Sequence, residues 1–185
     1  MKIAVTGHTS GIGLAIYNHF LDKGHVVLGF SKTNGYDLLD DTRRTQMYDQ
    51  LVQEDCDCLI NNAYPYTQSW GTNGFLQCAI LNDMWMRWRG NSTKIIITVG
   101  SLGADHDKNH FHPYAIHKRA IDDTARQLRM ANSSPQVTVV KPGYVNTRIV
   151  QKIVDKKCQP QQIAEIIEQI LCSPVKILDI TFEAR

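Results

Sequence analysis

Short apolar, β-branched runs alternate with longer amphipathic stretches along most of this chain. The apolar runs cover residues 2–6, 25–30, 57–61, 94–99, 136–141 and 175–180. Helix-like stretches cover 14–24, 42–53, 74–88, a segment starting near Tyr114, and 160–171. Such alternation predicts βαβ units, and therefore a parallel sheet with helices on both faces. We expect one doubly wound α/β domain over residues 1–185.

The second and third apolar runs, 25–30 and 57–61, have only one helical stretch between them. A further strand there would be reduced to about residues 36–38. The sheet would then contain about six to seven strands, depending on whether this short segment pairs.

Composition narrows the class of protein. The 185 residues are 43% hydrophobic and 21% charged, which fits one globular core. A formal charge of +2 without a long block of like charge favours neither nucleic acid nor a membrane surface as partner. No apolar run approaches the roughly 18 residues that span a bilayer, and no signal peptide precedes the first strand. With five scattered cysteines, we expect a cytoplasmic protein with reduced thiols.

A glycine-rich turn, VTGHTSGIG over residues 5–13, joins the first strand to the first helix. Its glycine gaps of four and two differ from those of the dinucleotide fingerprint GxGxxG. Such a turn can bring backbone N–H groups and the positive end of a helix to a pyrophosphate. A tight turn without any ligand is the alternative interpretation.

Tyr114 and Lys118 lie four residues apart, just after Pro113. On a helix, this spacing places both side chains on one face. Pairs of this kind also arise by chance on amphipathic helices, so other motifs must decide whether this pair is catalytic.

Five motifs, in this order, resemble those of the short-chain dehydrogenases/reductases. They are TGxxxGxG at residues 6–13, Asn61-Asn62-Ala63, Ser101, Tyr114-xxx-Lys118 and Pro142-Gly143. The resemblance covers nearly the whole chain. It implies a single NAD(P)-binding domain of Rossmann type that interconverts a carbonyl and an alcohol by hydride transfer.

The resemblance also implies roles for the catalytic residues. Tyr114 would be the acid/base, and Ser101 would bind the substrate oxygen. Lys118 would hold the nicotinamide ribose and lower the pKa of Tyr114, since one cation at about 4 Å supplies the roughly 4 kcal/mol that a three-unit shift needs. The fourth catalytic residue, an asparagine, would be Asn73, with Asn82 as the other candidate. Asn73 could instead simply cap a helix.

The resemblance places the cofactor against the carboxyl ends of several strands and on the catalytic helix. The implied contacts are Gly7, His8, Thr9, Ser10, Gly11, Ile12, Gly13, Ser31, Lys32, Asp37, Leu38, Asn61, Asn62, Ala63, Tyr114, Lys118, Pro142, Gly143, Val145 and Thr147. Asp37 would face adenine, and Val145 and Thr147 the nicotinamide carboxamide. Tyr64 departs from the family, which usually has glycine there, and would reshape the adenosine side.

NADP(H) is the expected cofactor, with NAD as the alternative. NAD binding normally uses an acidic residue at the end of the second strand, and residues 30–34 contain none. Ser31 and Lys32 instead offer a hydroxyl and an ammonium to the extra phosphate of NADP, unless Lys32 is simply solvated.

The segment after Thr147 is short for this family, so we expect a small or broadly accepted carbonyl or alcohol substrate, or a site completed by another subunit. A homodimer or homotetramer is expected, built on the helices that carry Trp85 and Tyr114, because 74–88 has more apolar positions than one face requires. The alternative function is a non-catalytic dinucleotide-binding sensor or scaffold. A nucleotide-sugar epimerase or dehydratase would need a larger substrate domain.

No metal site is expected. His106, His110 and His112 read best as a polar loop on the substrate side, because no carboxylate or cysteine completes a ligand shell. Cys56 and Cys58 have no second cysteine pair, so we expect them to pack as small hydrophobic side chains.

Overall fold

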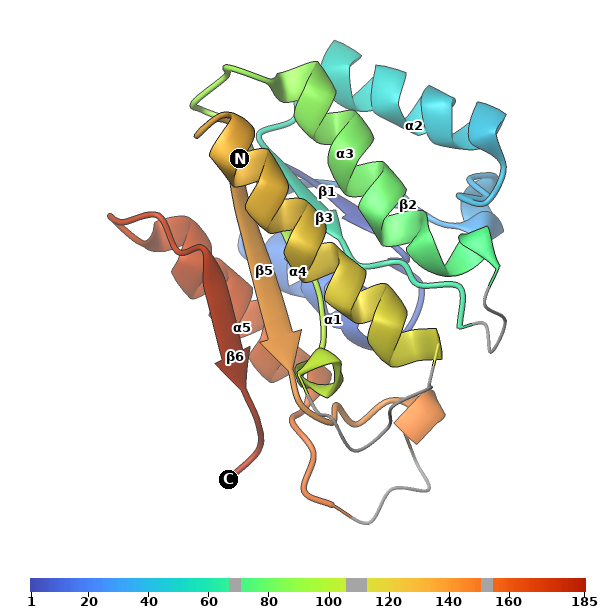
Figure 1. The fold of residues 1–185 in the computed structure, drawn as a ribbon, viewed down its shortest axis with the longest axis vertical. Helices are drawn as coiled ribbons and strands as arrows, with labels where there is room; N and C mark the ends of the chain where they lie inside the picture. The colour runs from blue at the N-terminus through green and yellow to red at the C-terminus, as the bar shows by residue number, and fades with distance from the viewer. Residues whose placement is uncertain (67–70, 106–112, 151–154) are drawn as a thin grey trace.

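A computed structural model describes residues 1–66, 71–105, 113–150 and 155–185 of the chain (Figure 1). Within these residues, one sheet of six parallel strands runs in the order β2-β1-β3-β4-β5-β6. The strands are β1 (Lys2–Thr6), β2 (Val26–Phe30), β3 (Cys58–Asn61), β4 (Ile95–Val99), β5 (Gln136–Pro142) and β6 (Asp179–Phe182). The expected doubly wound α/β fold is confirmed.

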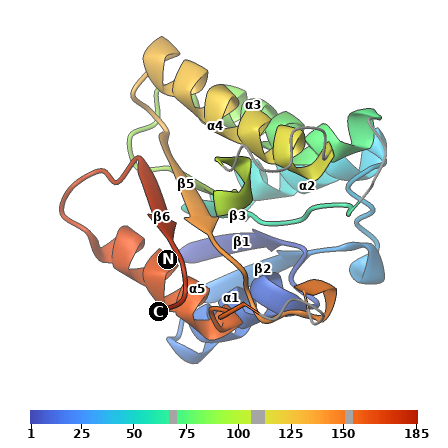
Figure 2. The same cartoon turned by 60° about the horizontal axis from the view of Figure 1, so that its bottom comes forward.

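Among the described residues, five α-helices cover the two faces of the sheet. They are α1 (Gly11–Asp22), α2 (Asp41–Gln53), α3 (Leu76–Trp88), α4 (Pro113–Ala131) and α5 (Pro160–Cys172). Figure 2 shows α2, α3 and α4 on one side of the sheet and α1 and α5 on the other. The order of the strands reverses at β1, which pairs with β2 on one edge and β3 on the other. In open α/β sheets, ligands bind at the carboxyl ends of the strands beside such a reversal.

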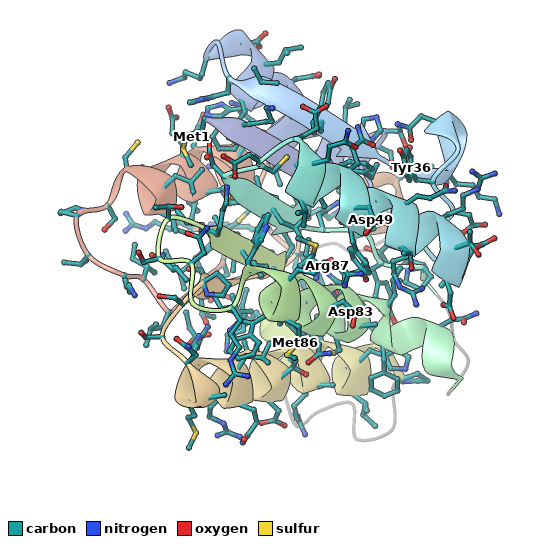
Figure 3. The ribbon with its side chains drawn as sticks, turned by 90° about the horizontal axis from the view of Figure 1, so that it is seen from above. Met1, Tyr36, Asp49, Asp83, Met86 and Arg87 are labelled. Atoms are coloured by element: carbon teal, nitrogen blue, oxygen red, sulfur yellow. The ribbon has the colours of Figure 1, made fainter. Side chains whose placement is uncertain are left out.

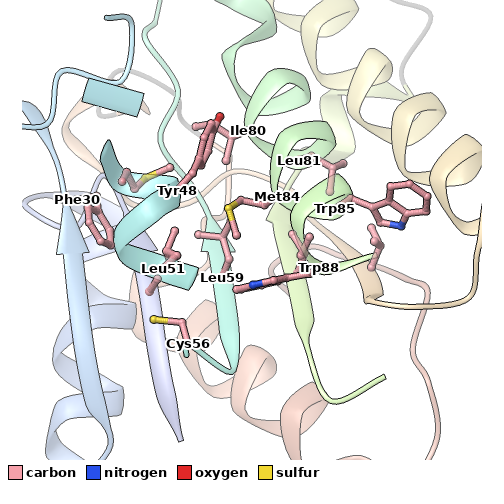
Figure 4. Close-up of a cluster of buried hydrophobic side chains, with 14 of the residues drawn as sticks. Phe30, Tyr48, Leu51, Cys56, Leu59, Ile80, Leu81, Met84, Trp85 and Trp88 are labelled. Carbon is pink, nitrogen blue, oxygen red and sulfur yellow. The ribbon is translucent and has the colours of Figure 1, made fainter. Parts of the chain in front are cut away.

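Each face of the sheet has its own apolar core. The larger core packs α2, α3 and α4 against the sheet through residues such as Phe30, Tyr48 and Trp88 (Figure 4). Cys56 belongs to this core, and Cys58 belongs to the core beneath α1 and α5. Both thiols are fully buried, as expected for cysteines that pack as small hydrophobic side chains.

The short strand expected at 36–38 does not form, so that prediction was wrong. Gly35 adopts a left-handed φ of 91°, and the backbone then turns, with Asp40 N–H donating to the Asp37 carbonyl. Tyr36 packs its ring edge-on against Phe30 instead of pairing with a strand. The last strand also begins four residues later than expected, at Asp179.

The apolar positions of α3 are used inside the chain. Ile80, Met84, Trp85 and Trp88 are each at most 5% exposed, packed in the core between α3 and its neighbours. On the outward side, Figure 3 shows Met86 near charged residues of α3. These apolar positions therefore no longer favour an interface, and the homodimer stays a prediction without support from α3. None of the helices in the described part of the chain is long and apolar enough to cross a bilayer.

Candidate active site

The glycine-rich turn follows β1 and leads directly into α1. Gly7 and Gly11 have left-handed φ values of 70° and 54°. A Cβ on Gly13 would lie 2.2 Å from the Gly7 carbonyl oxygen, so only glycine allows this approach of helix and strand. The Ser10 side chain does not cap α1, and the first helical turn has no acidic residue. The N-terminus of α1 therefore presents N–H groups that suit an anion.

Hydrogen bonds between Thr6 and the residues Asn62 and Ala63 tie the end of β1 to the end of β3. Thr6 Oγ1 accepts hydrogen bonds from the backbone N–H groups of Asn62 and Ala63, each at 2.9 Å. The Asn62 amide donates to the Thr6 carbonyl at 3.1 Å, and the buried Asn61 amide donates to the Gln77 carbonyl at 2.8 Å. The side-chain amides of Asn61 and Asn62 are thus engaged in hydrogen bonds within the fold. Ala63, in contrast, lines a cavity.

This cavity, of about 260 Å³, lies at the carboxyl ends of β1, β2 and β3. It is lined by Gly7, Ser31, Lys32, Tyr36, Asp37, Leu38, Leu39, Ala63, Tyr64, Pro65 and Leu76. Six of these residues were expected to contact the cofactor, and the aromatic residues Tyr36 and Tyr64 were not. The mixed apolar and polar lining suits a ligand with a flat ring and a hydroxylated or charged part.

An ion pair lies in the wall of this cavity. Lys32 Nζ is 3.0 Å from Asp37 Oδ2, and the two side chains are 82% and 38% exposed. The hydrogen bond from Lys32 lowers the pKa of Asp37 below its usual value, so Asp37 is a carboxylate at neutral pH. Pairs this exposed contribute at most about 1 kcal/mol. Lys32 can therefore leave Asp37 and pair with the anionic group of a ligand, with little loss of free energy.

His8, the histidine of the glycine-rich turn, packs against the backbone of β2. A Cβ on Gly29 would lie 2.4 Å from its ring, and the Tyr17 ring is 5.1 Å away. Burial lowers the pKa of His8, so the imidazole is neutral at pH 7. His8 therefore adds no positive charge for a phosphate.

Ser101 and Tyr114 meet beyond the end of β4. Ser101 caps the short 3-10 helix η3 (Leu102–Ala104), where its Oγ accepts from Gly103 N–H at 3.1 Å. A hydrogen bond between the Ser101 and Tyr114 side chains lowers the pKa of Tyr114, but burial has the larger effect and raises it. The phenol of Tyr114 is therefore protonated at neutral pH, which suits the donation of a proton.

Lys118 is 4% exposed and its ammonium nitrogen has two acceptors. Nζ donates to Gln77 Oε1 at 2.6 Å and to the Val99 carbonyl at 2.9 Å. Burial lowers the pKa of Lys118 to about 7. Nζ lies 5.7 Å from the centre of the Tyr114 ring, and the pKa of Tyr114 is raised rather than lowered. The structure thus differs from the expectation that Lys118 lowers the pKa of Tyr114. Burial disfavours the charged form of both groups, so it lowers the pKa of Lys118 and raises the pKa of Tyr114.

The amide that contacts Lys118 belongs to Gln77. Its side chain is buried, and Nε2 donates to the carbonyls of Asn61 and Val99 at 2.9 and 3.1 Å. These two bonds fix the amide orientation and leave Oε1 facing Lys118.

Both asparagines considered from the sequence are exposed, and the catalytic role expected of Asn73 stays a prediction. Asn73 is exposed in the 3-10 helix η2 (Thr72–Phe75), and Asn82 is exposed on α3. Gln77 was not among the site residues expected from the sequence. The available signal was a polar residue within the otherwise apolar run 75–81, at the start of what became α3.

The Pro-Gly motif extends β5 and leads back to the glycine-rich turn. Gly143 N–H donates to the Phe182 carbonyl at 2.8 Å. Val145 is buried and forms a single bridge to Cys158. A Cβ on Gly11 would lie 3.3 Å from Thr147 Cγ2, so Thr147 lies beside the start of α1. The structure thus brings Thr147 to the glycine-rich turn.

His106, His110 and His112 lie outside the described residues. Among the described residues, no group of three or more histidine, cysteine, aspartate or glutamate side chains is placed to hold a metal ion.

Neither a protein-family model nor a curated protein sequence matches this chain. Solved structures do match. A 4-hydroxyisoleucine dehydrogenase complexed with NADH has a TM-score of 0.80 at 20% identity, over 98% of this chain and 96% of that one. The 3-alpha-hydroxysteroid dehydrogenase of Pseudomonas sp. B-0831 with NADH has a TM-score of 0.76 at 20% identity, over 99% and 95%.

A short-chain dehydrogenase from Burkholderia cenocepacia J2315 in complex with NADP has a TM-score of 0.78 at 16% identity, over 98% of this chain and 95% of that one. At such identities the likeness establishes the fold alone. The chain therefore has the Rossmann-type fold of these dehydrogenases.

Proposed function

We propose that this protein is an NAD(P)-dependent oxidoreductase of the short-chain dehydrogenase/reductase type that interconverts a carbonyl and an alcohol. The observation that carries the proposal is that Ser101, Tyr114 and Lys118 converge at the carboxyl edge of the sheet. This is the same edge at which the glycine-rich turn opens onto the cavity. The likeness to dehydrogenases solved with NADH or NADP supports a nicotinamide dinucleotide as the bound group.

The residues present fit such a dinucleotide. The uncapped N-terminus of α1 suits the pyrophosphate, and the cavity beside Gly7 suits the adenosine part. Thr147, beside the glycine-rich turn, would contact the nicotinamide half. When bound, the nicotinamide supplies the hydride.

The side chains supply the proton. When a carbonyl is reduced, the protonated phenol of Tyr114 would give its proton to the carbonyl oxygen and would then take up a proton from solvent. Ser101, which is hydrogen-bonded to Tyr114 in this structure, would turn its single hydroxyl proton to the same oxygen and stabilise the developing charge there. Lys118, with Gln77 and Val99 as its other partners, would contact the ribose through its remaining N–H.

The test follows NADPH and NADH oxidation against a panel of aldehydes, ketones and quinones. We expect turnover of at least one small carbonyl. The near-complete burial of Lys118 favours the second candidate, a dinucleotide-binding sensor without turnover. Tight cofactor binding by calorimetry with no turnover across the panel would establish that second function.

Lys32 is expected to select NADPH over NADH. A charge-assisted contact to the extra phosphate contributes about 1.5 to 3 kcal/mol, so Lys32→Ala should reduce the NADPH preference about tenfold or more. Asp37→Asn should increase it about threefold, because Asp37 competes for Lys32. The ratio of kcat/KM for the two cofactors measures both effects.

Lys23→Ala is the matched control, because Lys23 is also an exposed lysine in an ion pair, with Glu168 on α5. It should leave the ratio unchanged. A parent enzyme that uses both cofactors equally, or a preference that survives Lys32→Ala, contradicts the role of Lys32.

A further inference from the structure

Tyr64 stands between the cavity and Lys118. Its ring lines the cavity beside Gly7. The same ring has its centre 5.0 Å from Lys118 Nζ and meets the Tyr114 ring edge-on at 5.3 Å. A ligand in the cavity therefore meets Tyr64 before it can reach Lys118.

The other sides of Lys118 are closed by the protein itself. Gln77 and the Val99 carbonyl accept two of its N–H groups from within the fold. Only 4% of the residue is exposed. With the Tyr64 ring in this position, the described part of the chain leaves Lys118 Nζ little access to an oxygen atom of a ligand.

His117 holds Tyr64 in place. Tyr64 Oη and His117 Nδ1 share a hydrogen bond of 2.9 Å. His117 is itself 1% exposed, with the Phe75 ring packed edge-on at 4.8 Å. A Cβ on Gly74 would lie 1.8 Å from the imidazole, so the backbone there lies directly against it. Phe75 and the backbone of Gly74 leave His117 no room to move with Tyr64. Tyr64 must therefore break its hydrogen bond to His117 when it moves away from Lys118.

We propose that Tyr64 is a specificity-determining residue, which lets the adenosine half of a dinucleotide enter freely and sets the affinity for the nicotinamide half. The inference rests on the proposed function, in which Lys118 contacts the nicotinamide ribose. The adenosine half occupies the cavity with Tyr64 in place. The nicotinamide half reaches Lys118 only after the Tyr64 ring leaves His117. The smaller the fraction of molecules in which the ring has left, the weaker the apparent affinity for the whole dinucleotide.

The experiment compares NADPH with adenosine 2′,5′-bisphosphate, its adenosine half, by calorimetry on the parent, Tyr64→Ala and Tyr64→Phe. In the parent, the two ligands should bind with similar affinity. Tyr64→Ala should tighten NADPH binding about tenfold and leave bisphosphate binding unchanged. Without the Tyr64 ring, NADPH no longer has to break the contacts of that ring with Lys118, Tyr114 and His117 before it binds. Tyr64→Phe keeps the ring but loses the bond to His117, and should tighten NADPH by about two- to threefold.

Tyr144→Ala is the control. Tyr144 is 46% exposed and directly follows the Pro-Gly motif, so its substitution removes an aromatic ring near the same edge of the sheet without removing a ring that packs on Tyr64, and it should leave the ratio of the two affinities unchanged. If the bisphosphate binds but NADPH binding is unchanged or weaker in Tyr64→Ala, the role of Tyr64 is overturned while the proposed function stands. If neither these two ligands nor NADH bind to the parent or to the variants, the proposed function falls, and this inference with it.

Discussion

Tyr114→Phe is expected to reduce turnover about a thousandfold while the cofactor dissociation constant stays within about twofold. The substitution removes only the phenolic hydroxyl, the group we assign as proton donor, and general acid catalysis typically contributes about 10²- to 10⁴-fold. The ring keeps its contacts with Tyr64 and Tyr66. Steady-state kinetics on the best carbonyl of the panel, together with calorimetry of NADPH binding, measures both quantities.

Tyr144→Phe is the matched control for this experiment. Tyr144 is 46% exposed and directly follows the Pro-Gly motif, so its substitution removes a phenolic hydroxyl near the same edge of the sheet. Its turnover should remain within about threefold of the parent. Turnover of Tyr114→Phe within tenfold of the parent would end the assignment of Tyr114 as the acid/base.

Lys118→Met is expected to change how the stability of the protein depends on pH. Burial lowers the pKa of Lys118 from 10.5 to about 7 in the folded state. Between these values the unfolded chain keeps a proton that the folded protein has released, so the free energy of unfolding rises with pH. The difference of about 3.5 units corresponds to at most about 5 kcal/mol at 1.36 kcal/mol per unit. Methionine has a stem of similar length and no proton to release.

The parent should therefore gain about 3 to 5 kcal/mol relative to Lys118→Met between pH 6 and pH 10.5. Chemical denaturation of both proteins across this range measures the difference, and groups common to both cancel. Lys156→Met, which removes an exposed lysine from the loop before α5, should follow the parent. A constant difference between the parent and Lys118→Met across this range would show that burial does not lower the pKa of Lys118 in the folded protein.

The sequence alone determined the doubly wound sheet, the course of most strands and the glycine-rich turn. These features depend on local properties: the alternation of apolar runs with helical stretches, and glycines where the backbone must take a left-handed φ. Six of the residues that line the cavity were also predicted, since the carboxyl ends of parallel strands meet at one edge. Local signals are weaker where a turn competes with a strand, as at residues 36–38.

Only the tertiary structure decided how the candidate catalytic residues interact. Gln77 meets Lys118 across 41 positions of sequence, and Tyr64 meets His117 across 53. No local pattern encodes such contacts, because they depend on how α3, α4 and the end of β3 pack together. The pKa values of Tyr114 and Lys118 also follow from burial, which is a property of the assembled fold. The sequence therefore supplied the chemical groups, and the packing around them decided which carry charge and which a ligand can reach.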